Sequence, residues 1–397
     1  MSSKRTVLSS PDLVALRAEG FNIEILGANL VVWDIPYVTK DRTIASGALV
    51  MPLDLNGDIT GQPKDHQAKF VGAHPCSHEG IEIEQLRHSV GAFKITDTLV
   101  AQHNFSNKPP RGHFLNFHEK VTHYADIIAA PAQLIDLEAT ARTRRVIEPR
   151  DESSPFRYLD TNSGRADINA ITAKLAVENI AIVGLGGTGS YVLEFIAKTP
   201  VKFIHLFDGD VFSSHNAFRA PGAAPIETLR KQVLKVEYLA SIYSNMHTGI
   251  VIHPYDMDEN HVEELCSMTC VFLCMDAGPK KKVVVERLEA FGITFIDVGM
   301  GLYAKNDMLG GTLQVVTSTP DNRERARSQM SFNGGNVDDE YDKNIQVADL
   351  NCLNAIFAVI RWKKLLGFYM DLNGERSTSF TVGSNLLLNE DEDDDEN

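Results

Sequence analysis

Short apolar runs alternate with helix-like stretches through the C-terminal part of the chain. The runs are rich in β-branched and aromatic residues, and most are separated by stretches with helical periodicity. They are the segments 179–185, 203–208, 249–254, 270–276, 294–299 and 311–318. Strands that alternate with helices in this order predict an α/β domain with a largely parallel sheet and helices on both of its faces.

The N-terminal part of the chain has a different pattern. Short apolar segments such as 29–38 and 47–55 are interrupted by glycine, proline and aspartate turn signals. This pattern predicts a separate α+β domain over residues 1–148. The second domain is expected over 149–389, and it begins with a polar, turn-rich linker at 150–165.

Two later segments complete the pattern. Residues 318–346 are charged and aperiodic, and a loop of that length inside a compact domain is usually functional or disordered. Residues 351–369 then restore a strong helical pattern. The last residues, 390–397, are almost entirely acidic and predict a disordered tail.

Composition narrows the class of protein. The chain has 397 residues, 43% of them hydrophobic, and a net charge of -15, about half of it in the acidic tail. This charge argues against a nucleic-acid partner, because duplex binding depends on lysine and arginine neutralising phosphates. No apolar run reaches the roughly 18 residues of a membrane span, and the N-terminus lacks the apolar core of a signal peptide. The 5 cysteines form no regular framework, which favours a cytoplasmic location.

Four glycines lie between the apolar run 179–185 and a helical stretch: Gly184, Gly186, Gly187 and Gly189. Glycines here allow a tight turn, close approach of the backbone to a phosphate, and close packing of helix on strand. The helix that follows offers unpaired N–H groups to an anion. Asp208 ends the next strand, at the spacing of a carboxylate that binds ribose hydroxyls. These features fit NAD, FAD and ATP equally.

The residues after Asp208 favour ATP. Asp210, Asn216 and Arg219 follow it, and a triphosphate site needs such donors to neutralise phosphates and a departing pyrophosphate. Lys231 and Lys235 are four residues apart and are predicted to share one face of one helix.

A later carboxylate suits a metal ion. Asp276 ends the apolar run 270–276, at the carboxyl edge of the predicted sheet, where ligands bind in open α/β folds. A carboxylate there suits Mg²⁺, which is bound through one or two carboxylates and phosphate oxygens. A buried carboxylate at the end of a strand is costly without a partner.

This ordered set resembles the ThiF/MoeB family of adenylyltransferases, which includes the ubiquitin-activating enzymes, over about residues 155–370. The shared pattern is a GxGGxG turn, a D-x-D pair, an S-x-N-x-x-R run that starts at Ser214 or His215, a lysine on a helix, and an aspartate closing a later strand. The resemblance implies a Rossmann-like domain. It also implies binding of ATP and Mg²⁺ and adenylation of a C-terminal carboxylate, usually that of a ubiquitin-like protein ending in Gly-Gly.

The resemblance also implies a role for each matched position. Asp208 would bind the ribose, Asn216 would orient the phosphates, and Asp276 would hold Mg²⁺. Arg219 and Lys235 would contact phosphates, with Lys231 as the alternative lysine. Relatives often add an arginine from an N-terminal segment onto the γ-phosphate, and Arg165, with Arg157 behind it, is the candidate.

The chain departs from the family pattern in its cysteines. Many relatives hold a structural zinc with two CxxC pairs, but Cys266, Cys270 and Cys274 form no such pair, so no zinc is expected. Many relatives also carry a thioester-forming cysteine in the long loop. The corresponding loop here, 319–348, contains none.

Two other cysteines are alternatives for thioester chemistry. Cys352 lies in the apolar late helix, where a buried, inert thiol is the commoner outcome. Cys76 lies in "GAHPCSHEG" between His74 and His78. That loop either exposes the thiol beside an imidazolium, which would lower its pKa, or forms a structured turn.

Several functions remain compatible with these patterns. The first is an activating enzyme for a ubiquitin-like protein, working with a downstream conjugating enzyme and dimerising through the apolar late helix. The second is an adenylyltransferase for another carboxylate, such as a peptide, a small molecule or a modified tRNA base, although the acidic charge argues against tRNA. The third is a catalytically silent ATP-binding module. An NAD(P) oxidoreductase is the fourth.

Overall fold

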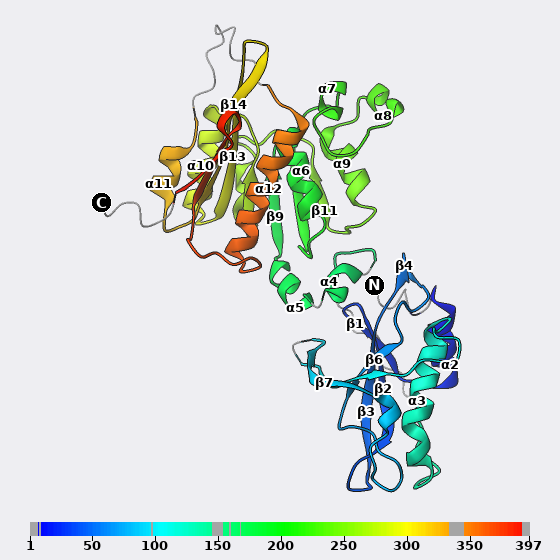
Figure 1. Ribbon diagram of the computed structural model, residues 1–397. Coiled ribbons are helices and arrows are strands. Elements are labelled where there is room, and N and C mark those ends of the chain that lie inside the picture. The colour runs from blue at the N-terminus through cyan, green and yellow to red at the C-terminus, as the bar shows by residue number, and fades with distance from the viewer. Residues whose placement is uncertain are drawn as a thin grey trace. The chain divides into compact units, whose positions relative to one another are not determined.

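The computed structural model describes residues 7, 9–96, 98–144, 154–158, 160–166, 168–332 and 345–390. It does not describe the side chains of residues 164, 165, 169, 170 and 390. The chain forms two compact units that divide between Ile171 and Thr172 (Figure 1). The limits 1–148 and 149–389 stay predictions, and each unit is described by itself below.

The second unit is built on an eight-stranded sheet in the order β11-β10-β9-β12-β13-β14-β15-β16. The strands are β9 (Asn179–Val183), β10 (Phe203–Phe207), β11 (Ile250–His253), β12 (Cys270–Leu273), β13 (Thr294–Lys305), β14 (Met308–Ser318), β15 (Ser377–Thr381) and β16 (Leu386–Glu390). In sheet order, neighbouring strands from β11 through β10, β9 and β12 to β13 pair in parallel. From β13 through β14 and β15 to β16, neighbouring strands pair antiparallel. The prediction of a largely parallel sheet is confirmed.

Side chains that alternate along each strand place helices on both faces of this sheet. Ile180 and Ile182 belong to a core that includes residues of α6, α9 and α12, whereas Ala181 and Val183 face a second core with α10 and α11. These helices are α6 (Gly187–Ile196), α9 (Lys235–Tyr243), α10 (Pro279–Ala290), α11 (Arg323–Gln329) and α12 (Ala348–Leu365). Figure 1 shows α12 and α6 in front of the strands. The strands are apolar on both sides because both sides are covered.

Three features of the second unit differ from the sequence prediction. The expected loop at 318–346 contains helix α11, which the pattern missed because Ala326 is its one buried residue. Its residues 333–344 lie outside the described part. Strands β15 and β16 were not predicted, since "STSFT" is largely polar and β16 is a short edge strand. The acidic tail beyond Glu390 also lies outside the described residues.

The first unit contains a six-stranded antiparallel sheet in the order β1-β2-β3-β6-β8-β7. Its strands are β1 (Ile23–Leu26), β2 (Asn29–Val38), β3 (Ile44–Pro52), β6 (Gln67–Val71), β7 (Arg87–Lys94) and β8 (Val100–Ser106), with a two-stranded ribbon of β4 (Leu55–Asn56) and β5 (Ile59–Thr60). Helices α2 (Pro11–Glu19) and α3 (Phe117–Gln133) pack their apolar residues into the main core of this unit. The predicted separate α+β domain is confirmed.

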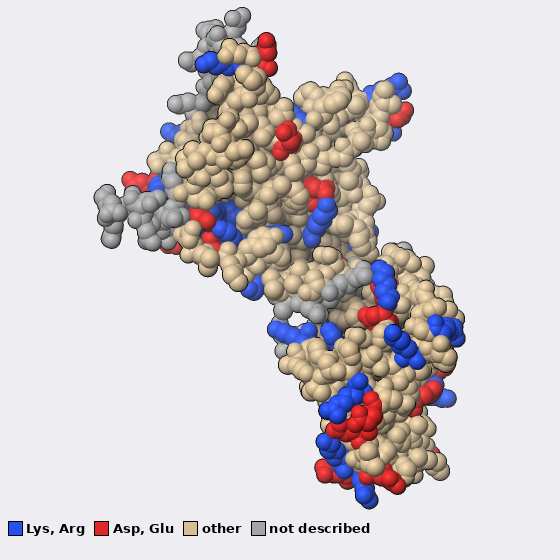
Figure 2. All heavy atoms as spheres, viewed as in Figure 1, with Lys and Arg blue, Asp and Glu red and all other residues tan. Residues whose placement is uncertain are grey.

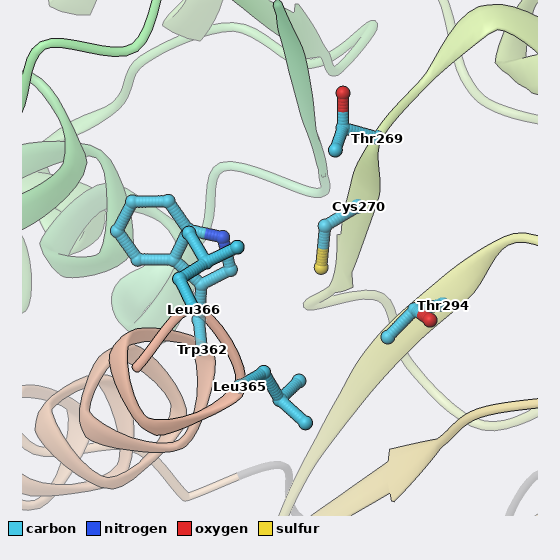
Figure 3. Close-up of a pocket in the computed structure, with 6 residues that line it drawn as sticks. All are labelled: Thr269, Cys270, Thr294, Trp362, Leu365 and Leu366. Atoms are coloured by element: carbon cyan, nitrogen blue, oxygen red, sulfur yellow. The ribbon is translucent and has the colours of Figure 1, made fainter. Parts of the chain in front are cut away.

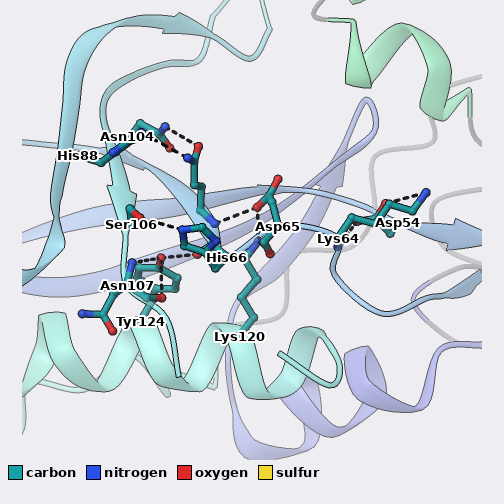
Figure 4. A network of polar contacts seen from close by, with 11 residues as sticks. Asp54, Lys64, Asp65, His66, His88, Asn104, Ser106, Asn107, Lys120 and Tyr124 are labelled. Atoms are coloured by element: carbon teal, nitrogen blue, oxygen red, sulfur yellow. Dashed lines mark hydrogen bonds and ion pairs between the residues drawn. The ribbon is translucent and has the colours of Figure 1, made fainter. Parts of the chain in front are cut away.

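A polar network attaches α3 to this sheet (Figure 4). The ammonium of Lys120, whose side chain is 1% exposed, donates to the backbone oxygen and to Oδ1 of Asp65. The hydroxyl of Tyr124 donates to the backbone oxygen of His66 and accepts from the backbone N–H of Asn107. Burial lowers the pKa of Lys120, because a buried charge is costly without a partner. The nearby carboxylate of Asp65 opposes that shift.

Two short helices, α4 (Thr161–Arg165) and α5 (Asn169–Thr172), lie at the end of the predicted linker 150–165 and just after it. Among the described residues, every helix is too short or too polar to cross a bilayer. On the face shown in Figure 2, acidic and basic side chains are interspersed among the residues drawn in colour.

Candidate active site

The glycine turn connects β9 to α6 at the carboxyl edge of the parallel strands, and packing leaves no room for a side chain at three of its four glycines. Gly184 has φ +88°, and a Cβ atom there would lie 2.6 Å from the backbone oxygen of Cys274. A Cβ atom on Gly189 would lie 1.9 Å from the backbone oxygen of Gly184. Both positions must therefore lack a side chain for α6 to pack on β9 and β12.

The other two glycines have different surroundings. A Cβ atom on Gly187 would lie 2.0 Å from Nδ2 of Asn351, on α12. A Cβ atom on Gly186, which caps the N-terminus of α6, would meet nothing within 4 Å. Gly186 thus borders open space at a helix N-terminus, where backbone N–H groups and the helix dipole favour an anion.

Asp208 follows β10 and holds the turn in place. Its side chain is 7% exposed, and Oδ2 accepts a hydrogen bond of 2.7 Å from the backbone N–H of Leu185, inside the turn. Oδ1 accepts from the backbone N–H of Asp210. The ammonium of Lys235 lies 3.3 Å from Asp208 and 2.6 Å from Oδ2 of Asp210. The expected ribose carboxylate and phosphate lysine therefore form an ion pair with each other.

The prediction that Lys231 and Lys235 share a face of one helix is wrong. Helix α8 (Ile226–Lys231) ends at Lys231, Gln232 adopts the left-handed conformation with φ 51°, and α9 begins at Lys235. Lys231 is exposed, whereas Lys235 is buried against the two aspartates. The structure thus brings Lys235, and not Lys231, to Asp208.

Replacing Lys235 with alanine is expected to lower the free energy of unfolding by about 3 kcal/mol, because it leaves the carboxylate of Asp208 buried without its cation. Urea unfolding measures this change. Lys231→Ala is the matched control and is expected to change the free energy of unfolding by less than about 0.5 kcal/mol. Equal losses in the two variants would contradict this assignment.

Asn216 and Arg219 supply buried donors on the short helix α7 (Ser214–Ala217) and just after it. Asn216 is 3% exposed, and its Oδ1 accepts from the backbone N–H of Ser213. Asn216 Nδ2 and Arg219 Nε are buried and have no hydrogen-bond partner among the described residues. Buried donors without acceptors are costly in a folded protein, so this segment suits an anionic ligand.

The side chain of Asp276 is less buried than the sequence predicted. Strand β12 ends at Leu273, and Asp276 lies three residues later in the loop that leads to α10. Its side chain is exposed rather than buried at a strand end. No group of three or more His, Cys, Asp or Glu residues in the described ranges has the arrangement of a metal site. An exposed carboxylate at this edge still suits Mg²⁺ that is held mainly by phosphates.

The sequence prediction missed a buried ion pair beside this loop. Lys281, in the first turn of α10, and Asp297, on β13, are 3% and 4% exposed, and Lys281 Nζ lies 2.7 Å from Asp297 Oδ1. Burial raises the pKa of Asp297, and Lys281 opposes this shift. Asp297 lies inside the apolar run 294–299. A carboxylate in an otherwise apolar strand was the sequence signal that could have predicted this buried ion pair.

The two arginine candidates from the N-terminal segment belong to the first unit. The side chain of Arg165 lies outside the described residues, and Arg157 is exposed. Their role at the γ-phosphate stays a prediction.

Of the two alternatives for the loop around Cys76, an exposed thiol or a structured turn, the structure shows the structured turn. Cys76 is 0% exposed and forms β-bridges with Val38 and Glu82. Burial raises the pKa of Cys76, with a smaller contribution from Glu82. The "HPCSH" segment is therefore the structured turn.

Alkylation tests this burial. In the native protein we expect Cys76 to react with iodoacetamide far more slowly than Cys266, which is exposed, because the thiolate is the reacting form. Peptide mass spectrometry of a time course measures both rates, and unfolding in urea should equalise them. Faster labelling of Cys76 than of Cys266 in the native protein would contradict the assignment.

Cys352 lies on α12 and is partly exposed. Burial raises its pKa, with a smaller contribution from Glu194. Neither candidate cysteine therefore has the lowered pKa of an activated nucleophile.

A separate pocket of about 220 Å³ lies at the amino ends of β12 and β13, facing the C-terminal part of α12 (Figure 3). Thr269, Cys270, Thr294, Trp362, Leu365 and Leu366 line it. Ligands of parallel α/β sheets bind at the carboxyl edge, so this pocket is not part of the candidate active site.

The fold and the site together define a Rossmann-like nucleotide-binding domain with a glycine-rich turn at the carboxyl edge of its parallel strands. The family model described as "ThiF family" matches residues 164–379, more than half of the 397 residues. The chain belongs to the ThiF family, whose members are ATP-dependent adenylyltransferases. A model described as "Domain of unknown function (DUF6791)" matches residues 11–161. No curated protein sequence matches the chain.

Among solved structures, PaaA is 15% identical over 56% of this chain and 75% of its own, with a TM-score of 0.40. MccB of E. coli with AMPCPP and MccA is 13% identical over 58% of this chain and 71% of its own, with a TM-score of 0.45. MccB of E. coli with ATP is 12% identical over 56% of this chain and 65% of its own, with a TM-score of 0.39.

Proposed function

We propose that the chain uses ATP and Mg²⁺ to adenylate the C-terminal carboxylate of a ubiquitin-like protein ending in Gly-Gly. The observation that supports this most directly is the pair of buried, unpaired donors, Asn216 Nδ2 and Arg219 Nε, on the segment that follows Asp208. A nucleotide whose ribose is bound near Asp208 would bring phosphate oxygens to these donors. A dinucleotide oxidoreductase has no need of them at this position.

The reaction assigns a task to each residue. An oxygen of the substrate carboxylate attacks the α-phosphorus, a new P–O bond forms, and the bond to the leaving pyrophosphate breaks. Arg219 and Lys235 stabilise the charge that develops on the phosphates. Asn216 orients the phosphates, and Gly186 lets the backbone of the turn approach them. Asp276 is the proposed ligand of Mg²⁺, which neutralises phosphate charge when bound.

The ammonium of Lys235 must change partners during this cycle. In the structure it lies between Asp208 and Asp210. We expect nucleotide binding to draw it toward the phosphates and to leave Asp208 to the ribose hydroxyls. Asp210, whose side chain is 70% exposed, can then be solvated by water at little cost.

Neither Cys76 nor Cys352 is a suitable acyl acceptor, because each is buried to some degree with a raised pKa. We expect the reaction on this chain to end at the acyl-adenylate, and a cysteine of a downstream conjugating enzyme to accept the acyl group. The apolar residues of α12 do not support homodimerisation through this helix, since Ala355, Ala358 and Trp362 are buried in the core of their own unit. The dimer itself stays a prediction.

Intact-mass spectrometry tests the substrate class. The chain is incubated with ATP, Mg²⁺ and either a ubiquitin-like protein ending in Gly-Gly, the same protein truncated by its last two residues, or a free peptide. We expect the mass of one added AMP on the complete ubiquitin-like protein alone. AMP on the peptide alone would support an adenylyltransferase for another carboxylate instead. ATP binding without any adenylate would indicate the silent module.

A further inference from the structure

Helix α12 carries two fully buried asparagines one turn apart in an otherwise largely apolar helix. Asn351 is 0% exposed and Asn354 is 1% exposed. Each leaves one amide atom, Nδ2 of Asn351 and Oδ1 of Asn354, without a hydrogen-bond partner among the described residues. An apolar residue would avoid this cost, so packing alone does not account for an asparagine at either position.

The two asparagines contact different parts of the second unit. Oδ1 of Asn351 accepts a hydrogen bond of 3.0 Å from Oγ1 of Thr188, in the first turn of α6. The amide of Asn351 also fills the space over Gly187, since a Cβ atom there would lie 2.3 Å from Cγ of Asn351. Asn354 instead donates through Nδ2 to the backbone oxygen of Gly299, on β13. Of the two asparagines, Asn351 is therefore the one that contacts the glycine turn.

We infer that Asn351 is a positioning residue for the phosphate-binding turn, an assignment that rests on the proposed function. Its Oδ1 fixes Thr188, and its amide requires glycine at 187, so the first N–H groups of α6 are held in one arrangement. Its Nδ2, which has no acceptor among the described residues, lies beside Gly187 in the first turn of α6. This arrangement favours an anion at the turn over a neutral ligand.

Calorimetric titrations of the full chain with ATP·Mg²⁺ and with adenosine test this inference. In Asn351→Leu, a side chain of similar size without polar atoms, we expect the Kd for ATP to rise about tenfold, because the aligned donors of the turn are lost. We expect the Kd for adenosine to stay within about twofold of the wild-type value, since adenosine has no phosphate. The thermal midpoint should stay at or near the wild-type value, because an unpaired buried N–H is also removed.

Two further variants complete the design. Asn354→Leu is the matched control on the same helix, and we expect it to change the Kd for ATP by less than about twofold. Asn351→Asp keeps the acceptor for Thr188 but places a negative charge at the turn, and we expect a larger loss of ATP affinity than in Asn351→Leu. If Asn351→Asp fails to fold, the Kd values of Asn351→Leu for ATP and adenosine still test the positioning role.

The outcomes separate this inference from the proposed function. An unchanged Kd for ATP in folded Asn351→Leu, or equal losses for ATP and adenosine, would overturn the positioning role and leave the proposed function standing. Failure of the wild-type chain to bind ATP would overturn both.

Discussion

Replacing Arg219 with alanine is expected to lower the rate of adenylate formation about 100- to 1000-fold, the loss typical of removing one donor that stabilises charge in a transition state. The guanidinium Nε is buried and has no partner among the described residues, so its removal leaves no acceptor of that atom unpaired among them. Stability should change little while activity falls. Pyrophosphate release under single-turnover conditions measures the rate.

Arg230→Ala is the control for this prediction. Arg230 lies on the neighbouring helix α8, where it is 70% exposed and lies 3.9 Å from Glu227. An exposed pair of this kind contributes little, so we expect activity within about twofold of the wild-type value. A similar loss in Arg230→Ala, or full activity in Arg219→Ala, would remove Arg219 from the site.

Alanine at Gly189 and at Gly186 is expected to separate the packing role of the glycine turn from its binding role. Gly189→Ala forces a Cβ atom to within 1.9 Å of the backbone oxygen of Gly184. We expect the free energy of unfolding to fall by about 3 kcal/mol or more, and nucleotide binding to be lost with the turn. Urea unfolding and ATP titration measure the two effects.

Gly186→Ala should behave in the opposite way. Its Cβ atom would meet no protein atom within 4 Å, so we expect the free energy of unfolding to change by less than about 1 kcal/mol. The Kd for ATP should nevertheless rise about tenfold or more, because the methyl group would occupy the space that the phosphates approach. Unimpaired ATP binding in Gly186→Ala would show that this open space is not the phosphate site.

The sequence predicted the parts of the fold that depend on local pattern. Strand β9 and the turn after it were predicted because an apolar run precedes four closely spaced glycines, and the structure shows why three of those glycines are required. Asp208 was predicted from spacing as a ribose-binding carboxylate, a role that stays a prediction. The structure shows that Asp208 also accepts a hydrogen bond from the backbone N–H of Leu185 in the turn. Burial on both faces of the sheet produces the continuous apolar runs that made the strands visible.

The features that the sequence did not reveal depend on tertiary contacts. Lys231 and Lys235 have helical spacing, but the left-handed Gln232 between them breaks the helix. Asn351 contacts Gly187 and Thr188 from a helix far along the chain, and no local pattern reports such a contact. Cys76 is buried because its backbone pairs with Val38 and Glu82. The sequence of a Gly/Pro-rich segment does not predict this pairing.

The most direct test of the account is ATP–pyrophosphate exchange with and without a ubiquitin-like protein ending in Gly-Gly, comparing the wild-type chain with Asp276→Ala. We expect exchange in the wild-type chain to require the protein substrate, and we expect Asp276→Ala to abolish it. Exchange that proceeds equally well in Asp276→Ala would contradict the role of this carboxylate. Absence of exchange in the wild-type chain, despite measurable ATP binding, would contradict adenylation of a ubiquitin-like protein.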